Sequence, residues 1–332
     1  MSDSPERPSS EAFEPPSGVH GRPGTPATDR PSQTALDPFD GVDLQALEKS
    51  LLRPRSLFNA TASTLVTFVT LLALVPLFSV VWMLLSHGGR RLGLAALTEL
   101  PPAALEAGGG FGNAIIGTLL IVGIATLFSV PFGVLTAVFL SQSEPDNRLA
   151  QGVRFAAKVL TGFPSILAGV FAYGSVVLLT GGFSALAGAV ALSILMLPTI
   201  TLTAEDAIRM VPVRMYEAAV GMGATPTQTV WTVLLPTAFS GIATGVMLAI
   251  ARAAGETAPL LFTALFSNYW LMSHGQFDIM RPTASLAVLI YNFAGMPFEN
   301  QLELAWAAAL VLVLLVLTTN IIGQVLSTRH PE

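Results

Sequence analysis

Long stretches without a charged residue dominate this sequence. Four of them cover residues 56–89, 107–143, 159–204 and 304–328. A helix that crosses the hydrocarbon core of a bilayer needs about 20 predominantly apolar residues. Each stretch is long enough for one such helix, and residues 159–204 are long enough for two. The pattern is therefore typical of an integral membrane protein built from helices.

The composition supports this class and excludes several others. Of the 332 residues, 52% are hydrophobic and 11% are charged, whereas a soluble domain carries about 25% charged residues. The chain has no cysteine, which excludes disulfide scaffolds, thiolate nucleophiles and thiolate metal sites. Its four histidines are far apart in the sequence, so a histidine metal cluster has no local support.

Residues 1–56 differ from the rest of the chain. They hold 15 of the 37 charged residues and nine of the 23 prolines, and they show almost no apolar periodicity. This composition is typical of a disordered polar segment. A basic start followed by a short apolar core is missing, which argues against a secretory signal. We therefore expect a disordered cytoplasmic tail over 1–56 and a transmembrane domain over 57–328.

Six membrane-spanning helices are predicted in the transmembrane domain. The pair Gly181-Gly182 is a turn signal and divides the longest uncharged stretch into two. Pro131, Pro164 and Pro198 fall inside spans and are expected to kink them. The expected spans are about 62–86, 113–140, 159–180, 183–203, 238–266 and 305–327.

The distribution of lysine and arginine predicts the orientation of these spans. If both termini are cytoplasmic, nine of the basic residues near span ends lie inside and three lie outside, in agreement with the positive-inside rule. The segment 204–237 is then a cytoplasmic loop, in which Arg209 and Arg214 are expected to be solvated. The loop 267–304 then faces outside, and residues 285–294 would form a short helix or a re-entrant segment there.

The loop 204–237 carries the most specific motif. Glu217-Ala218-Ala219 is followed after three residues by Gly223, and after nine more by Val233-Leu234-Leu235-Pro236. Sequence and spacing resemble the "EAA" loop of ABC-importer membrane subunits, which have isoleucine where Val233 stands. The resemblance implies a short coupling helix that docks in a cleft on the ATP-hydrolysing subunit. The residues that match the docking motif are Glu217, Ala218, Ala219, Gly223 and Pro236.

Local residue chemistry agrees with a docking role for this loop. Ala218, Ala219 and Gly223 are small enough for a partner surface to approach the backbone closely. Thr225-Pro226 should start a new helical segment, because threonine caps helices and proline suits the first turn. Pro236 is expected to break the chain before the fifth span. The alternative is an ordinary connecting loop with a solvated Glu217.

A second constellation lies within the predicted fifth span. Arg252 and Glu256 are four residues apart and share one face of a helix. Arg252 falls near the middle of that span, where a charge costs at least about 2.5–3.5 kcal/mol. The two side chains could simply neutralise each other's charge. Alternatively, the planar guanidinium of Arg252 could bind an oxyanion through two parallel hydrogen bonds. Gly241 and Gly245, in the same span, form a helix-packing motif.

The residues around this pair point to a narrower family. Residues 251–264, together with 162–166, 182–188 and 282–286, resemble the PstA family, one of two membrane subunits of the phosphate ABC importer. The resemblance covers about 57–328 and not the tail. It implies an all-α permease domain of the type I importer fold in the inner (plasma) membrane of a prokaryote. It also places Arg252 and Glu256 in the phosphate path.

The same resemblance implies partners. The chain would form half of the translocation path with a PstC-like subunit, above two PstB-like ATPase subunits that bind ATP and magnesium. A PstS-like phosphate-binding protein would deliver the substrate. The sequence supports this division of labour, because a P-loop requires Gly-x-x-x-x-Gly-Lys-Ser/Thr. Neither lysine of the chain, Lys49 or Lys158, has that setting, so we expect no cofactor and no ATP hydrolysis in this chain itself.

Two alternatives remain open from the sequence. One is an ABC permease for another oxyanion, such as molybdate or sulfate. The other is a secondary transporter or channel in which Arg252 and Glu256 relay ions. A self-sufficient carrier has no need of the Glu217 loop, and the sequence shows no clear inverted repeat of the kind that many such carriers have.

Overall fold

The computed structural model describes residues 54–273 and 276–328. The chain divides into two compact units, residues 1–68 and residues 69–332. The described part of the first unit is the beginning of helix α1, and the account below concerns the second unit. The predicted disordered tail lies outside the described residues except for its last three, which belong to α1.

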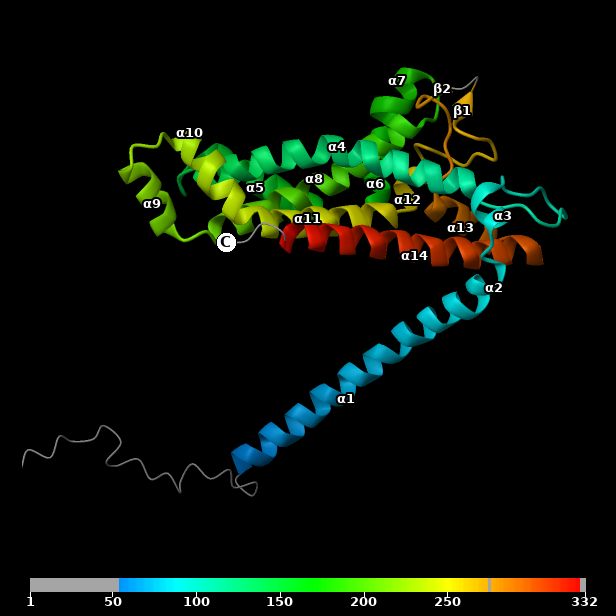
Figure 1. Ribbon diagram of the computed structural model, residues 1–332, viewed down its shortest axis with the longest axis horizontal. Helices are drawn as coiled ribbons and strands as arrows, with labels where there is room; N and C mark the ends of the chain where they lie inside the picture. The colour runs from blue at the N-terminus through cyan, green and yellow to red at the C-terminus, as the bar shows by residue number, and fades with distance from the viewer. Residues whose placement is uncertain (1–53, 274–275, 329–332) are drawn as a thin grey trace, which may run out of the picture. The chain divides into compact units, whose positions relative to one another are not determined.

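Helices make up most of the described chain (Figure 1). In the first half they are α1 (Pro54–Met83), the π-helix η2 (Leu84–Gly88), α2 (Gly89–Arg91), α3 (Leu94–Thr98), α4 (Gly112–Gln142), α5 (Arg148–Thr161), α6 (Ser165–Ala172), the π-helix η3 (Tyr173–Val177) and α7 (Leu178–Thr180). They continue with α8 (Ala185–Arg209), α9 (Val213–Gly221), α10 (Pro226–Thr229), the π-helix η4 (Val230–Leu234), α11 (Leu235–Ala254), α12 (Ala258–Leu261), α13 (Leu286–Ala294) and α14 (Glu299–Thr328). Strands β1 (Met272–Ser273) and β2 (Gln276–Phe277) form an antiparallel hairpin with Met272 opposite Phe277.

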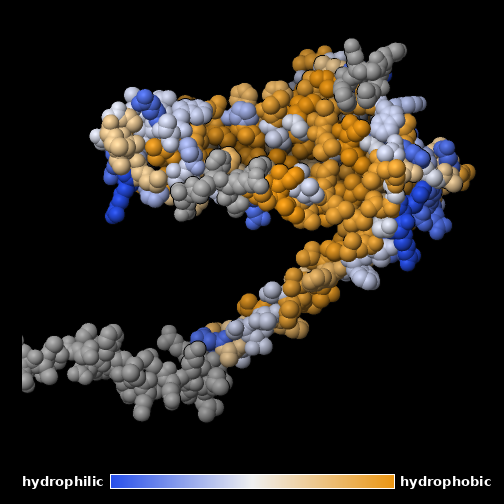
Figure 2. Space-filling view, viewed as in Figure 1, coloured by the Kyte–Doolittle hydropathy of each residue, from blue (hydrophilic) through white to orange (hydrophobic). Residues whose placement is uncertain are grey.

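Five described helices are long and apolar enough to cross a membrane: Phe58–Arg91, Gly112–Gln142, Ala185–Arg209, Pro226–Ala254 and Glu299–Val325. The helices Arg148–Thr161 and Ser165–Thr180 are also long and apolar enough when they are taken together, with a bend of 107° between them. Counting that pair as one span gives six, the number predicted from the sequence. The space-filling view shows hydrophobic surface along the long helices and hydrophilic surface around α9 and around α3 (Figure 2).

The third span is broken rather than kinked. The prediction placed one helix over 159–180, with Pro164 inside it. Instead, α5 ends at Thr161, and Pro164 takes an extended ψ of 126° at the start of α6. The residue before a proline is disfavoured in helical conformation, and Gly162 next to it weakens the helix further. The turn at Gly181 is confirmed, since this residue ends α7 with a φ of +77°.

The fifth span begins and ends earlier than predicted. A continuous helical run extends from Pro226 to Ala254, whereas the sequence placed the span at 238–266. Pro236 does not break the chain, because the wide π-turn of η4 lies directly before it and Leu235 donates its N–H to the carbonyl of Val230. A π-turn shifts the register of the backbone hydrogen bonds, and it thereby accommodates a proline that cannot donate one.

Small residues bring α8 into close contact with its neighbours α4 and α11. A Cβ placed on Gly133 of α4 would lie 2.7 Å from Ile200. A Cβ on Gly241 of α11 would lie 2.7 Å from the Cβ of Ala207, and one on Gly245 would overlap Thr203. The predicted packing role of the Gly241/Gly245 motif is therefore confirmed. Together these helices enclose the larger apolar core, whose central residues include Leu192 and Met196.

A second, smaller core lies where α13 packs against α14 and the start of α4. Phe111, Leu286, Leu289 and Leu304 are fully buried there. The predicted short segment in the outer loop is helix α13, and Ser285 caps it by accepting a hydrogen bond from the backbone N–H of Val288 at 3.3 Å. This core fixes the loops at the end of the bundle opposite to α9 (Figure 1).

Candidate functional site

The Glu217 motif forms a short helical hairpin at one end of the bundle. Helix α9 ends at Gly221, and Gly223 follows with a φ of +90°, a left-handed conformation that favours glycine. Its N–H bonds to the carbonyl of Val220 at 2.9 Å, and the N–H of Ala224 bonds to the carbonyl of Ala219 at 3.0 Å. Gly223 therefore shapes the turn by its conformation, because the space around it is open.

The next helix starts as the sequence predicted. Thr225 accepts a hydrogen bond from the N–H of Gln228, whose side chain in turn accepts from the N–H of Thr225 at 2.9 Å. This reciprocal capping box satisfies two N–H groups at the start of α10. It also fixes the angle at which α9 meets the long helix from Pro226 to Ala254.

The motif residues do not all face the same way. Glu217 and Ala218 are exposed, and the Glu217 carboxylate makes no hydrogen bond or ion pair with the described residues. Ala219 is 3% exposed, so it packs inside the hairpin and is not part of an open docking face as expected. Four apolar side chains of the hairpin, those of Val213, Met215, Val220 and Met222, are exposed.

Arg252 and Glu256 form a pair at the opposite end of the same helical run. Arg252 lies in the last turn of α11 and not in the middle of a span, because the helix starts earlier than predicted and stops at Ala254. Glu256 lies in the break between α11 and α12. The Nε of Arg252 is 3.4 Å from Oε1 of Glu256, so the structure brings the predicted partners together.

The geometry of this pair leaves much of the guanidinium available. The contact with Glu256 uses Nε, and neither Nη group bonds to a described residue. The Arg252 side chain is 45% exposed, whereas Glu256 is 16% exposed. An Arg side chain held by a single contact at Nε can still present its two Nη groups to an oxyanion in a fork.

The backbone around Glu256 is held firmly by neighbouring helices. A Cβ on Gly169 of α6 would lie 2.6 Å from the Cα of Pro259, so α6 and α12 are in backbone contact. The N–H of Ser184, just before α8, donates to the carbonyl of Thr263 at 2.9 Å. The break after α11 is therefore a fixed feature of the fold, and it sets the position of Glu256 relative to Arg252.

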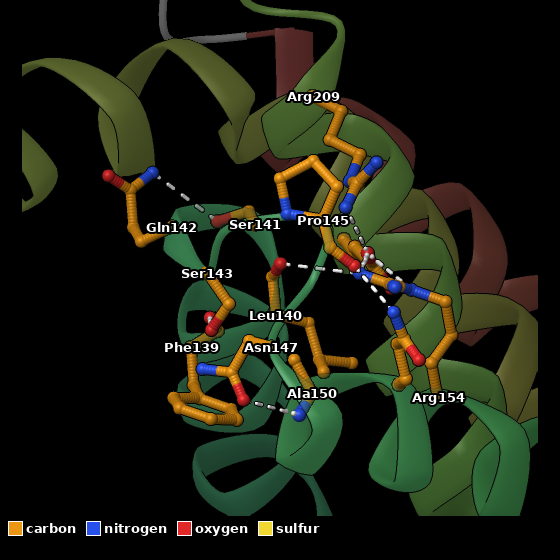
Figure 3. A network of polar contacts seen from close by, with 12 residues as sticks. Phe139, Leu140, Ser141, Gln142, Ser143, Pro145, Asn147, Ala150, Arg154 and Arg209 are labelled. Carbon is orange, nitrogen blue, oxygen red and sulfur yellow. Dashed lines mark hydrogen bonds and ion pairs between the residues drawn. The ribbon is translucent and has the colours of Figure 1, made fainter.

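A third group of charges was missed by the sequence reasoning. Glu205 of α8 is almost completely buried and accepts from Arg154 of α5, with Oε1 2.6 Å from Nη2, and from Arg209, at 3.0 Å. Arg154 also donates to the carbonyl of Leu140 near the end of α4, at 3.3 Å. Figure 3 shows Arg154 and Arg209 approaching this point from different helices.

This cluster, defined by Arg154, Glu205 and Arg209, joins the middle of α5 to the ends of α4 and α8, close to the start of α9. The sequence prediction for Arg209 was a solvated basic residue, but half of its side chain is covered and it is paired. The signal was present in the sequence, because Glu205 and Arg209 are spaced four apart on one helix. The partner on α5 depends on the broken third span and was not predictable.

The comparisons with known proteins agree on one family. Residues 129–330 match the profile of the family described as "Binding-protein-dependent transport system inner membrane component". The chain is 39% identical over 259 residues to the phosphate transport system permease protein PstA of Yersinia pestis, covering 77% of this chain and 86% of that protein. It is 40% identical over 251 residues to PstA of Haemophilus influenzae, covering 75% and 87%.

Solved structures agree at the level of the fold. The chain resembles a subunit of the inward-facing MetNI methionine ABC transporter, with a TM-score of 0.53 and 22% identity, over 67% of this chain and 95% of that one. It also resembles a chain of a bacterial alginate ABC transporter, with a TM-score of 0.56 and 16% identity, over 85% and 96%. The predicted all-α importer permease fold is thus confirmed, and the chain belongs to the binding-protein-dependent inner-membrane transport components, within the PstA group of phosphate permeases.

Proposed function

We propose that this chain is the permease subunit of an ATP-driven phosphate importer and that Arg252 contacts phosphate in transit. The observation that carries the second part is the free Nη edge of a guanidinium in a mostly apolar helical bundle. Charged side chains within membrane segments usually pair with one another or mark a substrate path, and Glu256 supplies the opposite charge when no anion is bound. Phosphate offers oxygens in the geometry that an arginine fork binds best.

The same pair favours phosphate over an oxyanion without protons. Near neutral pH phosphate still carries a proton, which it can donate to the Glu256 carboxylate while its other oxygens accept from Arg252. Sulfate has no proton to donate, and a carboxylate beside it would repel it. The PstA relatives are phosphate permeases by name, and this supports phosphate over the molybdate and sulfate alternatives.

We further propose that the hairpin formed by α9 and α10 docks on an ATPase subunit. An exposed carboxylate, Glu217, lies beside the exposed apolar side chains of Val213, Val220 and Met222. Apolar side chains grouped at a hydrophilic end of the bundle are typical of a protein interface (Figure 2). The proposed assembly contains a PstC-like permease, two PstB-like ATPases that bind ATP and magnesium, and a PstS-like binding protein. In this assembly both termini and the hairpin are cytoplasmic.

The substrate role is tested by ATP-dependent uptake of labelled phosphate in vesicles that contain all partner subunits. We expect Arg252→Ala to lower uptake at least about tenfold, since loss of one charged hydrogen-bond donor costs roughly 1.5–3 kcal/mol, and Glu256→Gln to weaken discrimination against sulfate. The matched control is Arg281→Ala, because Arg281 forms a comparable pair with Asp278, at 2.9 Å, but is 60% exposed. Uptake near the wild-type rate in both Arg252→Ala and Glu256→Gln would refute the assignment.

A further inference from the structure

A cavity of about 300 Å³ lies between α11 and α14, apart from the Arg252–Glu256 pair. We name it the amide cavity, after two side chains that line it. Its lining residues are Thr244, Met247, Leu248 and Ala251 of α11 and Asn320, Gly323 and Gln324 of α14. A water molecule takes about 30 Å³ of liquid volume, so the cavity has room for a tetrahedral oxyanion and several waters.

The polar groups of the amide cavity have donors and acceptors that are not used in hydrogen bonds to the described residues. Among the described residues, the side-chain amides of Asn320 and Gln324 have no hydrogen-bond partner. Thr244 donates its hydroxyl hydrogen to the carbonyl of Ser240 at 2.9 Å, which leaves the hydroxyl oxygen free to accept. An amide without a hydrogen-bond partner is costly to place in an apolar medium. Both helices are long and apolar enough to cross a membrane. The face that carries these amides is therefore expected to meet water, a ligand or protein rather than lipid.

The amide cavity lies on the same face of α11 as Arg252. Thr244, Leu248 and Arg252 are spaced four apart, and Ala251 of the cavity lining is next to Arg252. Thr244 is eight residues nearer to the α9–α10 hairpin than Arg252, which is about 12 Å along a helix. An anion that leaves Arg252 toward the hairpin end would therefore meet the amide cavity next.

A glycine sets the shape of this cavity. A Cβ on Gly323 would overlap the side chain of Met247, so glycine at this position allows α14 to approach α11 until Met247 fills the gap. Methionine is unbranched and has three rotatable bonds. One wall of the cavity is thus a side chain that can change its conformation without moving either helix.

We propose that the amide cavity is a second, uncharged oxyanion site through which phosphate passes between Arg252 and the cytoplasm. The NH₂ groups of Asn320 and Gln324 would donate to phosphate oxygens, and the Thr244 hydroxyl would accept from a protonated one. Neutral donors bind an anion more weakly than a guanidinium does. Conduction requires sites that are favourable enough to enter and weak enough to leave. The proposal rests on the proposed function, since it takes phosphate as the substrate.

The test uses the lack of cysteine in this chain. Asn320→Cys is compared with Ile322→Cys, which is at nearly the same depth of α14 but about 160° away around the helix and 53% exposed. Each variant is assembled with its partner subunits in vesicles and treated with a negatively charged, membrane-impermeant methanethiosulfonate. Modification is scored on this chain after separation from its partners. Thiolates form and react in water rather than in lipid, so we expect position 320 to react at least about tenfold faster.

Addition of phosphate should slow the reaction at position 320 if the cavity binds this anion. Equal rates at the two positions, no reaction at 320, or a rate that phosphate leaves unchanged would each overturn the proposal. If the wild-type assembly imports phosphate while position 320 is inert, the cavity is refuted and the proposed function stands. If 320 is protected by another oxyanion and phosphate is not imported, the proposed substrate fails instead.

A second measurement separates transport from accessibility. Asn320→Leu keeps the approximate side-chain volume and removes the donor, and Ile322→Leu is its control on the opposite face. We expect the first variant to lower phosphate uptake about threefold to tenfold at an unchanged amount of assembled complex, the size of one lost hydrogen bond. The control should transport at the wild-type rate. Wild-type uptake by Asn320→Leu would contradict a binding role for the amide.

Discussion

Replacement of Glu205 by glutamine tests whether the buried cluster holds the hairpin end of the bundle together. The side chain of Glu205 is 4% exposed and contacts two arginines. Glutamine has nearly the same size and keeps one carbonyl oxygen, but it loses the charge that both guanidiniums share. Arg154 then keeps its weaker bond to the carbonyl of Leu140, and Arg209 loses its partner.

The cost follows from the burial of each group. Removal of one partner from a buried ion pair costs about 3–5 kcal/mol, and a single charged hydrogen bond contributes roughly 1.5–3 kcal/mol. Arg154 is 24% exposed and Arg209 is 51% exposed, so both can regain water when the carboxylate is lost. We therefore expect Glu205→Gln to reduce the free energy of unfolding by about 2–3 kcal/mol.

The assay is the apparent Tm of the assembled complex in one detergent at one scan rate, because unfolding of large assemblies is often irreversible. Chains of 150–250 residues lose about 2–4 °C per kcal/mol, which gives a decrease of roughly 4–12 °C. The control Arg209→Gln removes the charge of the more exposed of the two arginines and should reduce the free energy of unfolding by about 0–1 kcal/mol. Equal Tm values for wild type and Glu205→Gln, or a larger loss in the control, would refute the reasoning.

Two glycine pairs give further predictions. Gly117→Ala places a methyl against the carbonyl of Ala284 and should lower the apparent Tm. Gly123→Ala on the same helix meets open space. It should leave the Tm unchanged or raise it, because glycine in a helix costs about 0.5–1 kcal/mol relative to alanine. A lower Tm in Gly123→Ala alone would contradict this packing. In Gly223→Val, the valine must adopt the left-handed φ at a cost of about 1–2 kcal/mol, so this variant should no longer co-purify with the ATPase. The control Gly221→Ala should still co-purify with it. Normal co-purification of Gly223→Val would count against the docking role.

The sequence predicted the helical membrane fold because membrane helices follow directly from the length of uncharged apolar stretches. The Gly181 turn, the Thr225 capping box and the Gly241/Gly245 packing motif were also predictable, since each depends on local residue chemistry. The Arg252–Glu256 contact followed from a spacing of four residues, although the helix ends between the two.

The errors arose where one structural feature compensates for another. Pro236 reads as a helix breaker, but the π-turn before it accommodates the missing N–H. Pro164 reads as a kink, but with Gly162 it separates two helices that meet at 107°. The Glu205 cluster requires α5 to fold back against α8, so it depends on a contact between distant residues that no local pattern contains.

The length of the helical run from Pro226 to Ala254 connects the α9–α10 hairpin to Arg252 mechanically. Because the run is continuous from Pro226 to Ala254, it is about 43 Å long and carries the hairpin at one end and Arg252 near the other. In the proposed assembly, an ATPase that displaces α9 would displace this helix and with it the guanidinium, less any bending within the run. The π-turn η4 and Pro236 are the points where this helix bends most readily. They lie at the hairpin end, which leaves the segment from Thr237 to Arg252, including the wall of the amide cavity, to move as one body.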